Sequence, residues 1–153
     1  MVITVSDGAS RGERRDESGD AVRRLLAQAG FRILDSAVLP DERDVIAERL
    51  RGAAEEHDLI VTTGGTGLGP RDVTVEATRD VIDYEVPGIG ELMRREGFEY
   101  TPMAALSRGL AGVRGHSLIV NLPGSPRGAT ESLQAALPVL GHACALLRGE
   151  RPH

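Results

Sequence analysis

The residues of this chain best suited to chemistry lie at positions 58–78, in the segment DLIVTTGGTGLGPRDVTVEAT. Its apolar run is short and is bounded by polar residues, which predicts a buried strand. Four glycines follow, and their backbone amides can approach an anion such as phosphate without obstruction by side chains. Arg71 and Asp72 then add a cation and a potential magnesium ligand. The segment therefore predicts a phosphate-binding loop.

The common nucleotide-binding motifs do not fit this loop. A Walker loop requires Lys and then Ser or Thr after its last glycine, whereas Gly69 is followed by Pro70 and Arg71. The dinucleotide pattern G-x-G-x-x-G also fails, because the glycines are spaced differently. Taken alone, a glycine cluster after a strand is more often a plain loop.

Apolar periodicity predicts alternating strands and helices along the whole chain. Strands are expected at 2–5, 33–39, 59–61 and 117–122. Helices are expected at 17–29, 42–56, 74–83, 88–96 and 128–147, with Pro138 kinking or restarting the last one. This alternation favours an α/β fold with a mostly parallel sheet and helices on both faces. The length fits a single domain spanning 1–153.

Every predicted strand ends in polar residues or glycine. In a parallel sheet these ends meet at one edge, where ligands bind. The candidate binding residues at this edge are Ser6, Asp7, Thr63, Gly64, Gly65, Thr66, Gly67, Asn121, Pro123, Gly124 and Ser125. Asp41 and Asp72 would face the same crevice, and two carboxylates beside phosphates are suited to one Mg²⁺ ion.

Simpler explanations exist for the same residues. Asp41 and Asp72 both precede predicted helices, so helix N-capping would account for each of them. The polar residues after the first and last strands are also typical of ordinary turns. Five arginines near the predicted site are expected to be mostly solvated, with one or two on phosphate: Arg71, Arg94, Arg95, Arg108 and Arg127.

Composition excludes several function classes. A formal net charge of −5 and 3% aromatic residues argue against a nucleic-acid-binding surface. No apolar run approaches the roughly 20 residues that span a bilayer, and no signal-peptide pattern is present, so we expect no membrane partner and a cytoplasmic location. All basic residues are arginines, which excludes a lysine nucleophile. The single cysteine, Cys144, is interpreted as core packing.

Several ordered motifs together carry a resemblance to a known family. They are LPDE at 39–42, TTGGTGLGPRDVTVEAT at 62–78, VPGIGELMR at 86–94, LSRGLAGVRG at 106–115 and NLPGSP at 121–126. Over nearly its full length the chain resembles the molybdopterin adenylyltransferase family of the MogA/MoaB type. The resemblance implies a three-layer, molybdopterin-binding-like domain that uses ATP and Mg²⁺ to convert molybdopterin to adenylyl-molybdopterin and pyrophosphate. It also implies a homotrimer or hexamer, and a molybdenum-insertion protein as the downstream partner.

Carried over by motif, the family's two important carboxylates correspond to Asp41 and Asp72. The glycine loop would hold phosphate, Ser107 and Asn121 would contact substrate, and Glu91 is a further candidate. Val75 departs from the proline that the family usually has there, which should leave Asp72 in place.

Three function classes remain open from the sequence. The first is the adenylyltransferase, in which Asp41 and Asp72 are metal ligands because the acceptor phosphate needs no strong general base. The second is a non-catalytic molybdopterin- or nucleotide-binding protein of the same pathway. The third is an unrelated nucleotide-dependent α/β enzyme. For self-association, the expected apolar surface lies on helical segments 88–93 and 104–110 and comprises Ile89, Leu92, Met93, Leu106 and Leu110.

Overall fold

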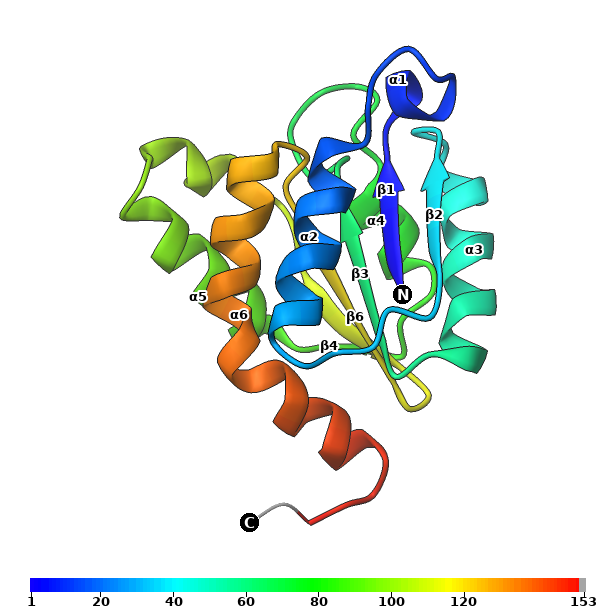
Figure 1. The fold of residues 1–153 in the computed structure, drawn as a ribbon, viewed down its shortest axis with the longest axis vertical. Coiled ribbons are helices and arrows are strands. Elements are labelled where there is room, and N and C mark those ends of the chain that lie inside the picture. Colours follow the sequence, from blue (N-terminus) through cyan, green and yellow to red (C-terminus); the bar gives the residue numbers. More distant parts are fainter. Residues whose placement is uncertain (152–153) are drawn as a thin grey trace.

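The computed structural model describes residues 1–151 and shows a three-layer α/β fold around a six-stranded sheet (Figure 1). The elements in chain order are β1 (Val2–Val5), α1 (Asp7–Ser10), α2 (Glu17–Gln28), β2 (Ser36–Leu39), α3 (Arg43–Glu56), β3 (Leu59–Thr63), α4 (Thr74–Arg79), β4 (Tyr84–Glu85), α5 (Pro87–Phe98), η1 (Pro102–Leu106), β5 (Ala111–Arg114), β6 (Ser117–Leu122) and α6 (Pro126–Leu147). None of the helices within 1–151 is long and apolar enough to cross a membrane.

The sheet has the strand order β2-β1-β3-β6-β5-β4. The first four strands in this order are parallel, which confirms the predicted mostly parallel sheet. Strands β5 and β4 then continue the sheet in antiparallel pairing with β6 and with each other. These two strands were not predicted, because four and two residues are too short to show a period of two.

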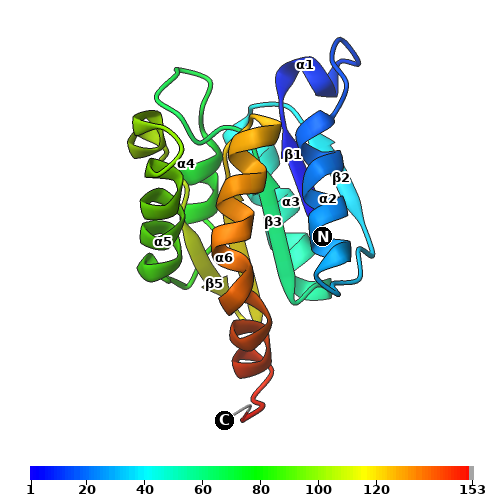
Figure 2. The same ribbon diagram turned by 60° about the vertical axis from the view of Figure 1, so that its left-hand side comes forward.

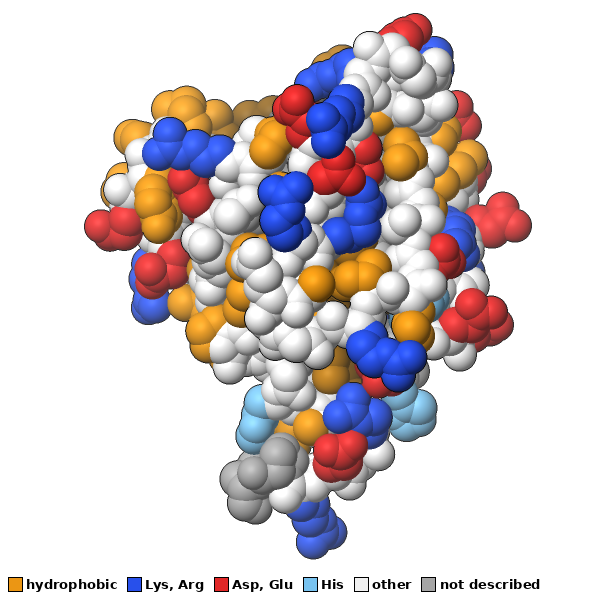
Figure 3. Space-filling view, in the orientation of Figure 1, with side chains coloured by type: hydrophobic (Ala, Val, Ile, Leu, Met, Phe, Trp, Pro, Cys, Tyr) orange, Lys and Arg blue, Asp and Glu red, His pale blue; other side chains and the backbone are white. Residues whose placement is uncertain are grey.

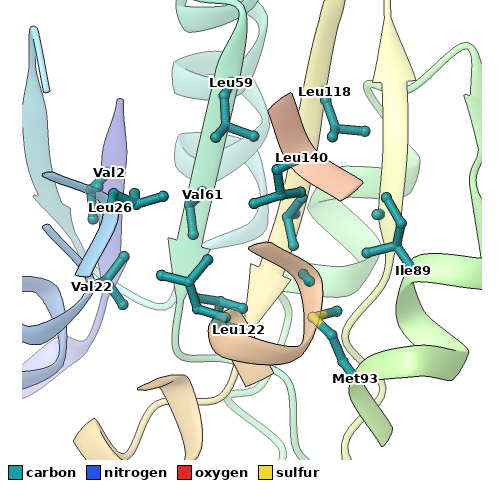
Figure 4. Close-up of a cluster of buried hydrophobic side chains, with 14 of the residues drawn as sticks. Val2, Val22, Leu26, Leu59, Val61, Ile89, Met93, Leu118, Leu122 and Leu140 are labelled. Carbon is teal, nitrogen blue, oxygen red and sulfur yellow. The ribbon is translucent and has the colours of Figure 1, made fainter. Parts of the chain in front are cut away.

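The sheet separates two hydrophobic cores, and successive side chains of its central strands point alternately into one core and the other. Val61 and Val120 belong to the core beneath α2, α5 and α6, which cover one face of the sheet (Figures 2 and 4). Ile60 and Ile119, their neighbours in sequence, belong to the opposite core beneath α3 and α4. Both faces of the central strands are therefore buried, as expected for parallel strands between two helical layers.

Several element boundaries differ from the prediction. Residues 33–35 are not in β2, and α4 ends at Arg79 because the chain then turns into β4. The expected helix over 104–110 is also wrong: only the 3-10 helix η1 forms, and residues 107–110 lead into β5. Helix α6 does not restart at Pro138 but continues through it, and Figure 1 shows its second half leaving the direction of the first.

All four parallel strands end at the same edge of the sheet, the upper edge in Figure 1. Short helix α1, the glycine-rich loop after β3 and the first turn of α6 lie at this edge. The predicted convergence of the strand ends is therefore present, and this edge holds the candidate site.

Candidate functional site

In the middle of the glycine loop, at residues 65–67, the carbonyls are occupied by the protein and the amides are unpaired. The carbonyl of Gly65 accepts from the amide of Thr74 at 3.1 Å, and the carbonyl of Thr66 accepts from the amide of Arg108 at 2.9 Å. The amides of Gly65, Thr66 and Gly67 donate no hydrogen bond to any residue among 1–151. Three adjacent free donors at a strand end form the backbone environment that an anion requires.

Glycine is required at the start of this loop for reasons of folding. Gly64 and Gly65 have φ values of 103° and 71°, in the region that side chains rarely adopt. A Cβ on Gly64 would collide with the carbonyl oxygen of Val5, and one on Gly65 would collide with the side chain of Thr74. A substitution at Gly65 is therefore expected to damage folding at least as much as binding.

Gly67 offers the cleaner test of anion binding. Its φ is not positive, and an added Cβ would lie 3.0 Å from Oδ2 of Asp72, facing the site. We expect Gly67→Ala to fold normally and to weaken binding of Mg²⁺-pyrophosphate about 10- to 100-fold, because the added methyl group would keep the phosphate from approaching the loop and so weaken one charge-assisted hydrogen bond. Titration calorimetry and thermal unfolding measure the two effects.

The control for this prediction is Gly52→Ala in α3, where nothing lies within 4 Å of the added Cβ. The control is expected to keep full affinity. Unchanged affinity in Gly67→Ala as well would remove the loop from the anion site.

Asp72 is directed toward the glycine loop, and it does not cap a helix. Its Oδ2 accepts the amide of Gly69 at 2.9 Å, while the backbone amide of Asp72 donates to the carbonyl of Gly69 at 3.0 Å. The N-cap residue of α4 is Val73, without a side-chain cap. The N-capping explanation for Asp72 is therefore wrong, and its carboxylate folds back over the loop.

Asp41 is held by the first loop of the chain. Its Oδ2 accepts the amide of Asp7 at 2.9 Å, and its own amide donates to Oδ1 of Asp7 at 3.0 Å. Helix α3 has Glu42 as its N-cap residue with no side-chain cap bond, so N-capping does not explain Asp41 either. This reciprocal pair joins the ends of β1 and β2.

The carboxylates at this edge have opposite electrostatic environments. Arg71 donates from Nε and Nη2 to both oxygens of Asp7, each at 3.0 Å, and these bonds lower the pKa of Asp7. Burial raises the pKa of Asp41, and the charges of Asp7 and Asp72 raise it further. The charge of Arg71 opposes this rise but does not cancel it, so the negative charges of Asp41 and Asp72 remain unfavourable to each other, and a cation bound between them would relieve this repulsion.

Two hollows of about 400 Å³ each meet at this edge. One is polar and contains Ser6, Asp41, Arg14 and Asp16. The other is mainly apolar, with Met93, Met103, Ala104 and Leu106 in its wall. The residues common to both are Gly65, Asp72, Gly124 and Ser125. Figure 3 shows acidic and basic side chains interspersed around the upper part of the molecule, so no single sign of charge dominates there.

Most of the predicted site residues line these two hollows. The apolar cavity includes Thr66, Gly67, Ser107, Asn121 and Pro123, and the polar hollow includes Gly64. Asp7 lines neither but holds Asp41.

Three predicted residues do not offer a free side chain to the site. Two of them use their side chains in hydrogen bonds with other parts of the protein, and the third lies outside both hollows. Thr63 donates to the carbonyl of Pro123 at 2.6 Å, and the buried amide of Asn121 donates to Thr62 and Thr78 at 3.0 Å each. Glu91 is exposed on α5 and lines neither hollow.

The apolar wall of the cavity was missed from the sequence. Met93 on α5 and Leu106 of η1 lie within the motifs at 86–94 and 106–115, but their apolar side chains carry no signal of a binding wall and were expected at a self-association surface. Arg94 was expected to be mostly solvated, but it lines the cavity and donates to the carbonyl of Gly109 at 2.7 Å. Only the packing of α5 and η1 against each other reveals this wall.

Comparisons with known proteins agree with this geometry. A family model described as "Probable molybdopterin binding domain" matches residues 1–142. The chain belongs to this family. A molybdopterin adenylyltransferase of Helicobacter pylori is 43% identical over 152 residues, covering 97% of this chain and 86% of the relative.

Solved structures of the same family are also similar. The molybdopterin biosynthesis enzyme MoaB of Thermus thermophilus has a TM-score of 0.92 and 56% identity, covering 97% of this chain and 95% of its own. The Mog protein of Mycobacterium ulcerans has a TM-score of 0.89 and 41% identity, with 95% and 96% covered. The three-layer fold expected from the resemblance is therefore confirmed.

Proposed function

We propose that this chain transfers AMP from ATP to molybdopterin, forming adenylyl-molybdopterin and pyrophosphate. The observation that carries the proposal is the row of unpaired amides at Gly65, Thr66 and Gly67, beside Asp72 where the two hollows meet. Both substrates carry phosphate, so their reacting groups can meet at this shared wall while their ring systems extend into separate hollows. The family relatives named molybdopterin adenylyltransferase support this choice of substrates.

The reaction requires an oxygen of the terminal phosphate of molybdopterin to attack the α-phosphorus of ATP in line. A P–O bond forms to this oxygen, and the bond to pyrophosphate breaks with its electron pair going to the leaving oxygen. The attacking phosphate is already ionised at pH 7, so no general base is needed. The protein contributes by positioning the two phosphates and by donating hydrogen bonds from the glycine loop.

Asp41 and Asp72 are the residues that would hold a magnesium ion. Each uses one carboxylate oxygen for a backbone amide, and the other oxygen accepts no hydrogen bond within 1–151. The described chain has no group of three or more His, Cys, Asp or Glu side chains that could hold a metal, so Mg²⁺ would take its remaining ligands from water and phosphate, as it commonly does. When bound, Mg²⁺ would neutralise charge on the phosphates and on the leaving pyrophosphate.

A transfer assay tests the proposal directly. Purified protein, ATP labelled at the α-phosphate and molybdopterin are expected to give labelled adenylyl-molybdopterin and one pyrophosphate per transfer. EDTA should stop the reaction and added Mg²⁺ should restore it. Binding of both substrates without transfer would identify a non-catalytic binding protein of the same pathway, and the absence of molybdopterin binding would reject the pathway itself.

The product is an activated molybdopterin, so we propose a molybdenum-insertion protein as its downstream recipient. We also propose a cytoplasmic location for this reaction.

We also propose that the chain works as a homotrimer or a trimer-based hexamer. Ile89, Met93 and Leu110, which were expected to contribute surface for this, are instead buried in the core of the single chain. The exposed apolar side chains of the same region are Phe98, Tyr100, Met103 and Leu106, with exposed fractions of 57%, 56%, 64% and 49%. Figure 3 shows hydrophobic atoms gathered at the upper left, over this part of the fold.

Self-association that covers this region is expected to appear in multi-angle light scattering as a mass near three or six chains. Phe98→Glu together with Met103→Glu should shift the mass toward 16.3 kDa, because two charges would have to be buried in the interface. Val45→Glu, on exposed apolar surface of α3, is the matched control. A mass of one chain for the unmodified protein at micromolar concentration would reject the oligomer.

A further inference from the structure

Arg108 lies directly after Ser107, in the segment that joins η1 to β5. Its side chain was expected to be mostly solvated, but it is half-buried and each of its three nitrogen atoms donates to another residue. The residues that it contacts belong to the glycine loop and to α4, which are 32 to 41 positions away in the sequence.

The guanidinium of Arg108 links the glycine loop to the residues that follow it. Its Nε donates to the carbonyl of Gly67 at 2.9 Å, and its Nη2 donates to the carbonyl of Asp72 at 3.0 Å. Its Nη1 forms an ion pair with Glu76 on α4, and its backbone amide donates to the carbonyl of Thr66. One residue therefore holds the middle of the loop, Asp72 at its end and the helix that follows.

These bonds determine the direction of the groups on the other side of the loop. A peptide unit is planar, so the bond from the backbone amide of Arg108 to the carbonyl of Thr66 fixes the direction of the Gly67 amide. The bond from the Arg108 side chain to the carbonyl of Gly67 restrains Gly67 itself and fixes the direction of the Leu68 amide. Holding the carbonyl of Asp72 restrains the backbone from which its carboxylate extends. Arg108 itself does not line either hollow, whereas Ser107 lines the apolar cavity.

Arginine suits this role and lysine does not. The fork of the guanidinium presents several N–H donors in fixed directions, and here it satisfies two carbonyls and a carboxylate at once. A lysine ammonium would keep the charge but would not hold all three acceptors in this geometry.

We infer that Arg108 is a positioning residue for adenylyl transfer, which sets the amides of the glycine loop and the carboxylate of Asp72 for the reacting phosphates. The effect of Arg108 on catalysis rests on the proposed function, whereas the effect of Arg108 on the loop rests on geometry alone. Through the adjacent Ser107, the same segment joins the apolar cavity to the phosphate-binding loop.

The test compares Arg108→Lys with Arg114→Lys. Arg114 is also partly buried and donates to a backbone carbonyl, that of Val81 at 2.8 Å, but it lies away from both hollows. For Arg108→Lys we expect kcat to fall on the order of 100-fold with a smaller change in KM, the cost of misplacing reacting groups by about 1 Å. Hydrogen exchange in peptides covering 65–72 should become faster, and Mg²⁺-pyrophosphate should bind more weakly. Arg114→Lys should leave all three measurements unchanged.

A second variant removes the risk that an unpaired Glu76 destabilises the protein. Oε2 of Glu76 is buried and has no hydrogen-bond partner within the described residues, so loss of Arg108 would leave the carboxylate without its cation. Arg108→Gln is therefore combined with Glu76→Gln, which removes this charge. This double variant should fold and should show the same faster exchange and loss of kcat. Wild-type kcat and loop exchange in both Arg108 variants would overturn the inference. If the unmodified protein transfers no AMP, the proposed function fails, while hydrogen exchange and pyrophosphate binding still decide the role of Arg108.

Discussion

Replacing Asp72 by asparagine is expected to lower kcat for adenylyl transfer by about two to three orders of magnitude while leaving the fold intact. Asparagine keeps a side-chain oxygen that can accept the amide of Gly69, so the turn over 69–72 should persist. It removes the negative charge that would bind Mg²⁺ beside the reacting phosphates. Charge stabilisation by a metal in such reactions is worth several kcal/mol, which converts to this loss of rate.

The control for Asp72→Asn is Asp83→Asn. Asp83 likewise accepts a backbone amide, that of Gly115 at 2.7 Å, but this bond lies at the turn between β5 and β6, away from both hollows. Steady-state kinetics over a range of Mg²⁺ concentrations and thermal unfolding are measured for both variants. We expect a changed Mg²⁺ dependence only in Asp72→Asn. Normal turnover in a destabilised Asp72→Asn protein would show that this aspartate only shapes the turn.

Replacing Asp41 by asparagine is expected to reduce turnover similarly without lowering stability at neutral pH. The carboxylate of Asp41 is half-buried, and burial together with the charges of Asp7 and Asp72 raises its pKa above the ordinary value of 3.8. The ionised form is therefore less favourable in the folded protein than in the unfolded chain. Asparagine can still accept the amide of Asp7 through its side-chain oxygen but has no charge to bury.

The pH dependence of unfolding separates this effect from ordinary loss of a contact. Because the folded protein binds the Asp41 proton more tightly, ionisation of Asp41 lowers the free energy of unfolding as the pH rises from about 3.8 through the raised pKa. The stability gained by Asp41→Asn over the unmodified protein should thus be largest at neutral pH and should shrink as the pH falls toward 4. Urea denaturation at several pH values measures this difference.

Asp7 provides a comparison of opposite sign in the same unfolding experiment. Its bonds with Arg71 lower its pKa, so its contribution to stability is present above the unfolded value and is lost as the pH falls through the folded pKa. Asp7→Asn should therefore lower stability at neutral pH, in contrast to Asp41→Asn. A loss of stability at pH 7 in Asp41→Asn, combined with normal turnover, would assign Asp41 a structural role only.

The mostly parallel sheet and the edge that carries the site could be predicted from the sequence. Apolar periodicity depends on neighbours within a few residues, and the glycine, proline and aspartate signals at the strand ends are equally local. The predicted strand at 117–122 therefore coincides with β6, and Asp41 and Asp72 lie at the edge where they were expected. Strands β4 and β5 were not predicted, because two and four residues are too few to show the apolar alternation of a strand.

The sequence by itself thus determined the order of the elements, the glycine loop and the two carboxylates at one edge of the sheet, because these follow from local periodicity and from the geometry of parallel strands. Only the tertiary structure decided how individual side chains are used. Asn121 is committed to Thr62 and Thr78 inside the core, and Arg108 holds a loop rather than facing solvent. Arginine and asparagine each have several donors and many rotamers, so their partners are selected by distances between segments that lie tens of residues apart in the chain.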